Sequence, residues 1–189
     1  MSEEQSQQKY QVRFDWGRAG FTALAEQSDV VIVVDVLPEE APVIARPAPP
    51  FDLSAGGPLV VTAGLTNRTA VADWVLARQA EKGDRFAVAV IAAGAARPDG
   101  SIRFAVEDLL GAGSVIDALI GLGIDHCSPE AAAASAAFVG LKRAVRHLVS
   151  ASESGAQLVA SGGGALVHAA AQLDASSEVA AGAAVTHWP

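Results

Sequence analysis

The chain has 189 residues, of which 51% are hydrophobic and 18% charged, so it suits one globular domain and is too apolar to be disordered. Its net charge of −8 at pH 7 disfavours nucleic acid as a partner, because phosphate backbones are bound by clustered lysines and arginines. The single cysteine, Cys127, cannot form an internal disulfide, which favours a cytoplasmic location.

The N-terminal region predicts a short tail followed by a strand. Residues 1–9 are polar, so we expect a disordered tail, and they lack the apolar stretch of a signal peptide. Apolar and polar residues alternate from Tyr10 to Trp16, which predicts a strand, and residues 18–27 have helical character. We expect residues 10–189 to form one α/β domain.

The segment "DVVIVVDVL", residues 29–37, is a nearly continuous β-branched run. Such a run is typical of a strand that is buried on both faces of a parallel sheet. Its longest apolar part, residues 30–34, is far too short to span a bilayer, so we expect no membrane partner. Residues 38–58 hold six of the nine prolines and predict a loop, which is unusually long for a compact domain.

The rest of the chain alternates strands with helices. The patterns predict strands over 59–65, 85–94 and around 183–186, and helices over 66–83, 106–122, 129–150 and around 154–161 and 165–173. Thr66 or Asn67 can cap the first of these helices, and Gly83 can end it. The alternation predicts a three-layer, mainly parallel sheet flanked by helices.

Ligands of such folds bind beyond the carboxyl ends of the strands. We expect Asp35, the turn at residues 64–69 and the loop over 93–108 to gather there. A carboxylate that ends a buried strand can hold Mg²⁺, although Asp35 can equally cap a loop. A haloacid-dehalogenase-type phosphatase is excluded, because it needs a second aspartate where this chain has Leu37.

Glu107 and Asp108 begin an otherwise apolar helical segment. Burying an ionised carboxylate without a partner is costly, so this pair either caps the helix in water through the helix dipole or holds a ligand. Gly111 and Gly113 follow inside the same helix, where each costs about 1 kcal/mol relative to alanine. Close packing or a nearby ligand should offset that cost.

Other motifs are weak. The stretch "SGGGALVH", residues 161–168, has Val167 where a dinucleotide-binding fingerprint needs its third glycine. The two candidate metal-binding types, histidine and cysteine, show no ligand-like spacing at His126, Cys127, His147 and His168. No serine nucleophile elbow or phosphate-binding P-loop appears in the sequence.

The stretch "RFAVEDLLGAG", residues 103–113, resembles a motif of the 2-phosphosulfolactate phosphatase family, (R-F/P)-x-x-E-D-x-x-(C/G)-A-G. Three further stretches resemble segments of the same family and occur in the same order. They are "VVIVVDVL", "GLTNRTAVADWV" and the C-terminal region with its Ser-Gly-x-x-Leu and Leu-Asp elements. Asn67 is retained in the second stretch, and Thr69 stands where the family has serine. The resemblance covers roughly residues 10–37 and 59–180.

The resemblance implies an α/β phosphatase that depends on Mg²⁺ and removes phosphate from 2-phospho-3-sulfolactate, a step towards coenzyme M. The expected catalytic and metal-binding residues are Asp35, Glu107 and Asp108. Asn67, Thr69 and Arg103 are expected to bind the phosphate or another anionic group of the substrate, because a helix start and an arginine both suit tetrahedral anions.

The chain also departs from the family pattern. "PEEAPV" follows Leu37 where members have arginine or serine and then threonines, and the proline-rich stretch replaces a longer segment with a Thr-x-Asn-Gly motif. Gly111 stands in the place of a common cysteine. The alternative is therefore a non-catalytic remnant that binds a small anion or acts as an assembly partner. A missing middle segment would also leave a sheet edge, which a homodimer can cover.

Overall fold

The structure is a computed structural model, and it describes residues 7–37, 58–97 and 99–182. A five-stranded sheet has the order β1-β4-β2-β3-β7, with β1 to β4 parallel and β7 antiparallel to β3. Its strands are β1 Val12–Trp16, β2 Val30–Val34, β3 Leu59–Ala63, β4 Val88–Ala92 and β7 Ala180–Ala181. A two-stranded hairpin is formed by β5 Ala95–Ala96 and β6 Ile102–Arg103.

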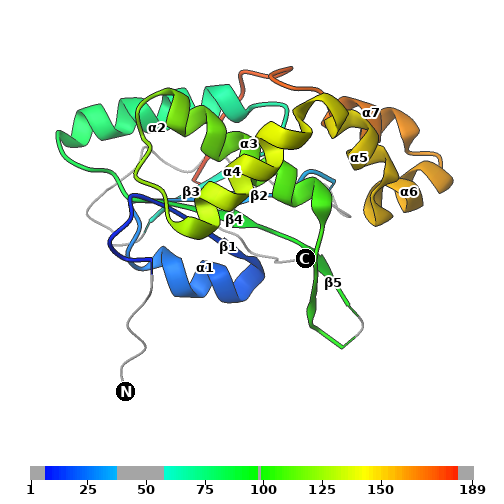
Figure 1. The fold of residues 1–189 in the computed structure, drawn as a ribbon, viewed down its shortest axis with the longest axis horizontal. Coiled ribbons are helices and arrows are strands. Elements are labelled where there is room, and N and C mark those ends of the chain that lie inside the picture. The colour runs from blue at the N-terminus through cyan, green and yellow to red at the C-terminus, as the bar shows by residue number, and fades with distance from the viewer. Residues whose placement is uncertain (1–6, 38–57, 98, 183–189) are drawn as a thin grey trace.

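Helices cover both faces of the sheet, as the sequence predicts. Figure 1 shows α1 on one face, α2, α3 and α4 on the other, and α5 to α7 grouped beyond one end, while the β5–β6 hairpin projects from the body. The helices are α1 Gly17–Ala25, α2 Arg68–Lys82, α3 Val106–Gly121, α4 Pro129–Leu141, α5 Val145–Ala151, α6 Glu153–Ala160 and α7 Gly164–Ala170. The predicted three-layer α/β architecture is therefore confirmed.

The two central strands explain the layers. All five residues of β2 and all five of β4 are buried, because each strand has a helix layer on either side. The larger core lies between the sheet and α2 to α5, and a smaller cluster lies under α1. None of the helices in the described ranges combines the length and the apolar character that a bilayer crossing needs.

The glycines of α3 allow close packing. A Cβ atom on Gly113 would lie 2.1 Å from the carbonyl oxygen of Ala134 in α4, and one on Gly111 would lie 2.7 Å from Cγ2 of Val36. Both distances are too short for a real side chain, so these positions require glycine. The packing explanation for the two glycines is confirmed, and it brings the start of α3 close to the end of β2.

Several predicted boundaries need correction. The predicted helix over 129–150 is interrupted by one 3₁₀ turn, η2 Lys142–Ala144, directly after Gly140 and Leu141, where glycine weakens the α-helix. The predicted tail is wrong for residues 7–9, because the buried Gln7 side chain exchanges two hydrogen bonds with the backbone of Phe14, both 3.0 Å long.

Three further predictions involve segments at the limits of the described residues. Residues 1–6, nearly all of the proline-rich loop and the predicted strand around 183–186 lie outside them. Strand β7 lies just before that predicted strand and pairs with Val61 and Thr62 of β3, so it covers part of the sheet edge. The homodimer stays a prediction.

Candidate functional site

The carboxyl ends of the parallel strands lie level with one another. Trp16 at the end of β1 pairs in register with Ala92 of β4, Ala92 with Val34 of β2, and Val34 with Ala63 of β3. The loops that follow these strands therefore meet at one edge of the sheet, where the N-terminus of α3 also arrives. This is the edge at which open α/β sheets bind their ligands.

Asp108 connects three elements at this edge. Its Oδ1 accepts a hydrogen bond of 2.8 Å from the backbone N–H of Val36, which follows β2. Its Oδ2 accepts one of 2.9 Å from the N–H of Gly94, which follows β4. The side chain, only 2% exposed, thus holds the first turn of α3 against both central strands.

Asp35 lies next to this contact, since it directly precedes Val36. Burial raises the pKa of Asp108 well above its ordinary value, and the negative charge of Asp35 is the next largest cause, followed more weakly by that of Glu107. The two backbone hydrogen bonds oppose this rise without cancelling it. The structure therefore places Asp35 and Glu107 near enough to Asp108 for each charge to act on it, although Asp35 is distant in the chain.

Glu107 is the second buried carboxylate of the pair, with an exposure of 2%. Its Oε2 atom is buried and has no hydrogen-bond partner among the described residues. Solvent capping of α3 by this pair is wrong, because neither side chain reaches water. A buried, unpaired carboxylate oxygen is costly, and a cation at this position would remove the cost.

The unpaired oxygen of Glu107 has the chemistry of a Mg²⁺ ligand, and Mg²⁺ as a cofactor stays a prediction. No group of three or more His, Cys, Asp or Glu side chains in the described ranges is arranged to hold a metal ion. Mg²⁺ does not need such a cage, because it is usually held by one or two carboxylates, substrate phosphate and waters. Glu107, through its unpaired oxygen, and Asp35 are the two carboxylates that suit this mode. Whether Asp108 is a direct ligand stays a prediction.

The start of α2 is arranged differently from the prediction. The Oδ1 of Asn67 accepts from the N–H of Gly64 at 2.9 Å, and its Nδ2 donates to the carbonyl of Glu178 at 3.0 Å. The N–H of Thr69 donates to Oδ1 of Asp174 at 3.1 Å. Both predicted anion-binding residues thus bond within the protein, and Asn67 is not the side-chain cap of the helix.

Arg103 is also bonded within the protein. Its guanidinium donates to Oγ of Ser154 at 2.8 Å and forms an ion pair of 3.4 Å with Glu153. These contacts tie β6 to the first turn of α6, whose N-terminus Ser152 caps. Substrate binding by Asn67, Thr69 and Arg103 stays a prediction, and it requires these residues to exchange partners.

Sequence reasoning missed Arg68, the first residue of α2. Its side chain is 12% exposed and pairs with Asp117 of α3 at 3.3 Å and with Asp174 at 3.0 Å. The guanidinium also lies over the ring of Phe138 at 5.4 Å. The Leu-Asp element of the resemblance contains Asp174, so the sequence did indicate one partner of this ion pair. Nothing in the sequence distinguishes Arg68 itself from the other arginines.

Comparison with known proteins identifies the family. The model of the 2-phosphosulpholactate phosphatase family matches residues 51–182. The chain belongs to the 2-phosphosulfolactate phosphatase family. A search of curated proteins found no match.

The matched range includes five of the six predicted site residues of this family member. Asn67, Thr69, Arg103, Glu107 and Asp108 lie inside it, and Asp35 lies before it. Within the matched range, the family segments contact each other, since Thr69 bonds Asp174 and Arg103 bonds Ser154. Part of the family pattern therefore maintains the architecture around the acidic residues.

Proposed function

We propose that this protein is a Mg²⁺-dependent phosphomonoester hydrolase of the 2-phosphosulfolactate phosphatase type, which acts on a small phosphorylated acid. The observation that carries the proposal is the buried Oε2 of Glu107, which has no partner among the described residues and lies next to Asp108, on which the charge of Asp35 also acts. Family membership supports the same reaction class. The buried Oε2 of Glu107, which lies near other acidic groups and has no partner among the described residues, would be destabilising without a cation.

In this proposal Glu107 and Asp35 would hold the metal ion. Bound Mg²⁺ supplies neutralisation of the phosphoryl oxygens and orientation of the attacking water. Asp108 acts through the backbone, because its bonds to Val36 and Gly94 fix the start of α3 and thereby the position of Glu107. Arg103 binds a substrate anion in this proposal only if its guanidinium releases Glu153.

The second candidate is a non-catalytic remnant that binds a small anion or acts as an assembly partner, and one observation favours its assembly-partner form. Asn67, Thr69 and Arg103 all bond to protein groups, so the predicted anion receptors are engaged. Calorimetric titration with sulfolactate and with phosphate separates the two candidates. Binding without turnover supports the remnant.

The test of the proposed function is Mg²⁺-dependent release of phosphate from phosphosulfolactate and simple phosphomonoesters. We expect turnover by the wild type and loss to background in Glu107→Gln. Glu130→Gln is the matched control, because Glu130 lies in the first turn of α4 and is exposed. Background release by the wild type on every substrate would contradict the enzymatic function.

A further inference from the structure

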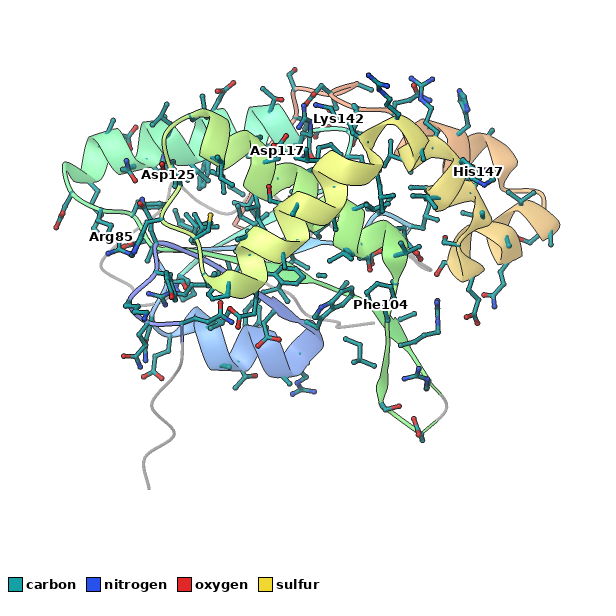
Figure 2. All side chains as sticks on the ribbon, viewed as in Figure 1. Arg85, Phe104, Asp117, Asp125, Lys142 and His147 are labelled. Atoms are coloured by element: carbon teal, nitrogen blue, oxygen red, sulfur yellow. The ribbon has the colours of Figure 1, made fainter. Side chains whose placement is uncertain are left out.

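An exposed apolar patch lies beside the acidic residues. It consists of Trp16 at the end of β1 and of Ile102 and Phe104 at the root of the hairpin, where Figure 2 labels Phe104. Phe104 is 57% exposed and Ile102 is 42% exposed, and Trp16 is half-buried. Exposed apolar side chains that gather at one place mark a binding surface more often than scattered ones do.

The patch is built on a rigid support. The ring of Phe104 lies 5.2 Å from that of Trp16, which in turn meets the buried Phe14 edge-on at 5.8 Å. Ile102 lies across Gly17 and Gly94, where an added Cβ would come within 2.5 Å and 2.7 Å of its side chain. Each of the three side chains therefore contacts a neighbouring part of the fold, and Trp16 connects the patch to the core.

The patch and the acidic site share one edge of the sheet. Gly94, which Ile102 covers, donates its N–H to Asp108. Trp16 and Val34, the neighbour of Asp35, are both in register with Ala92, so they are two strand spacings apart, or roughly 10 Å. A small molecule with its phosphate at the carboxylates can reach the patch with its other end.

The surroundings of Arg103 do not favour a sulfonate at that end. The guanidinium that would meet it is already paired with Glu153 and Ser154. The neighbouring side chains Ile102 and Phe104 are apolar, and removing a sulfonate from water beside them is costly.

We propose that this enzyme selects phosphorylated hydroxy acids whose far end is apolar and preferably aromatic, with that end seated on Trp16, Ile102 and Phe104. The inference rests on the proposed function. In the reaction, water attacks phosphorus and the bond from phosphorus to the substrate oxygen breaks. One proton of the water ends on the released hydroxy acid, and the oxygen of the water stays in the inorganic phosphate. No further reactant is required.

A matched pair of substrates tests the inference. 2-Phospho-3-phenyllactate and 2-phospho-3-sulfolactate differ only in the group at the far end. We expect kcat/KM to be at least about tenfold higher for the phenyl compound, which corresponds to about 1.4 kcal/mol. Phe104→Ala should lower the ratio of the two values about tenfold, and Leu166→Ala, which removes a 65% exposed side chain from α7, should leave the ratio unchanged. An equal or higher value for the sulfonate would overturn the inference, with the phosphatase activity intact.

Equilibrium binding separates this inference from the proposed function. If neither compound nor any simple phosphomonoester is hydrolysed, the proposed function fails. Quenching of Trp16 fluorescence by 3-phenyllactate or 3-sulfolactate then decides whether the patch binds the apolar group, with Trp16→Phe as the reference. Tighter binding of phenyllactate that weakens in Phe104→Ala supports the patch, and the opposite order overturns it. A dimer by light scattering that becomes a monomer in Phe104→Ala would also overturn it, since a second copy would then cover the patch.

Discussion

Asp108 and Glu107 are neighbours in the chain but have different roles. Asp108 uses both carboxylate oxygens to accept backbone N–H groups, which is how a buried carboxylate is stabilised without a cation. Glu107 keeps a buried oxygen that no described residue bonds. The first side chain is suited to positioning, and the second is suited to binding a ligand.

Replacement of Asp108 by asparagine should destabilise the fold. The amide nitrogen of Asp108→Asn cannot accept a hydrogen bond, so the N–H of either Val36 or Gly94 loses its partner. A buried unsatisfied group costs about 1–3 kcal/mol, and urea unfolding should detect a loss of that size. An unchanged midpoint would show that the bonds to Asp108 do not hold α3 in place.

The pKa of Asp108 predicts a pH dependence of the metal-free protein. Because folding raises this pKa, the folded state favours the protonated carboxyl group. The contribution to stability is complete below the usual aspartate pKa of about 3.9 and is lost as pH rises through the raised value. Urea midpoints measured in EDTA from acid to neutral pH should show this loss in the wild type. The Asp108→Asn variant should not show this loss of stability with rising pH. If its urea midpoints change with pH as those of the wild type do, another group causes the loss.

At the scale of elements, the contact between α3 and α4 depends on Gly113. Alanine at this position would place Cβ 2.1 Å from the carbonyl oxygen of Ala134, and the helices would have to separate. Overpacking of this kind typically costs 1–3 kcal/mol or more, and thermal unfolding of Gly113→Ala should show it.

Gly121→Ala provides the control for that substitution. Gly121 ends the same helix, and a Cβ there would meet nothing within 4 Å. Alanine favours the helix over glycine by up to about 1 kcal/mol, so this variant should be as stable as the wild type or slightly more stable. Equal destabilisation of both variants would mean that the clash with α4 is not the cause.

The contact of the start of α2 with α3 and with Asp174 depends on the ion pairs of Arg68. Arg68→Met would leave Asp117 and Asp174 without their cation, and hydrogen bonds of charged groups contribute about 1.5–3 kcal/mol. Arg78→Met in the same helix removes a surface ion pair with Glu81 and a cation–π contact with Trp74, and it should cost about 1 kcal/mol or less. Chemical denaturation compares the two, and an equal cost would show that the Arg68 network is no stronger than a surface ion pair.

Asp174 adds an acid-sensitive contribution to this contact. Burial alone would raise its pKa, but hydrogen bonds from Thr69 and the charge of Arg68 lower it overall. The stability that it contributes is therefore present above the usual aspartate pKa and is lost as pH falls through the lowered value. This dependence is opposite in sign to that of Asp108.

At the scale of the whole molecule, the sequence predicts the sheet and its helix layers better than it predicts the hydrogen bonds between distant side chains. The β-branched run over residues 29–37 predicts a central parallel strand, because only strands covered on both faces are so uniformly apolar. The same periodicity cannot show that Asn67 and Arg103 bond to Glu178 and Ser154, since these partners lie far away in the chain. The sequence indicates candidate site residues by their chemical type. Which of them already bond to other protein groups is visible only in the three-dimensional structure.

The convergence of acidic residues illustrates the same difference. The position of Asp35 after a buried strand predicts its arrival at the edge of the sheet, and the position of Glu107 at a helix start predicts the same edge. Which of the carboxylates is satisfied by the backbone depends on the φ and ψ angles of the loops at Val36 and Gly94. Residue patterns do not report these angles.

Thermal unfolding with and without Mg²⁺ tests the central claim most directly, because it reports binding at Glu107 without requiring a substrate. At a free Mg²⁺ concentration of about 100 times its dissociation constant, the wild type and Glu130→Gln should gain about 2.7 kcal/mol. Glu107→Gln should lose this gain. A wild type that Mg²⁺ does not stabilise, or a Glu107→Gln variant that gains as much, would contradict a cation site at the unpaired carboxylate.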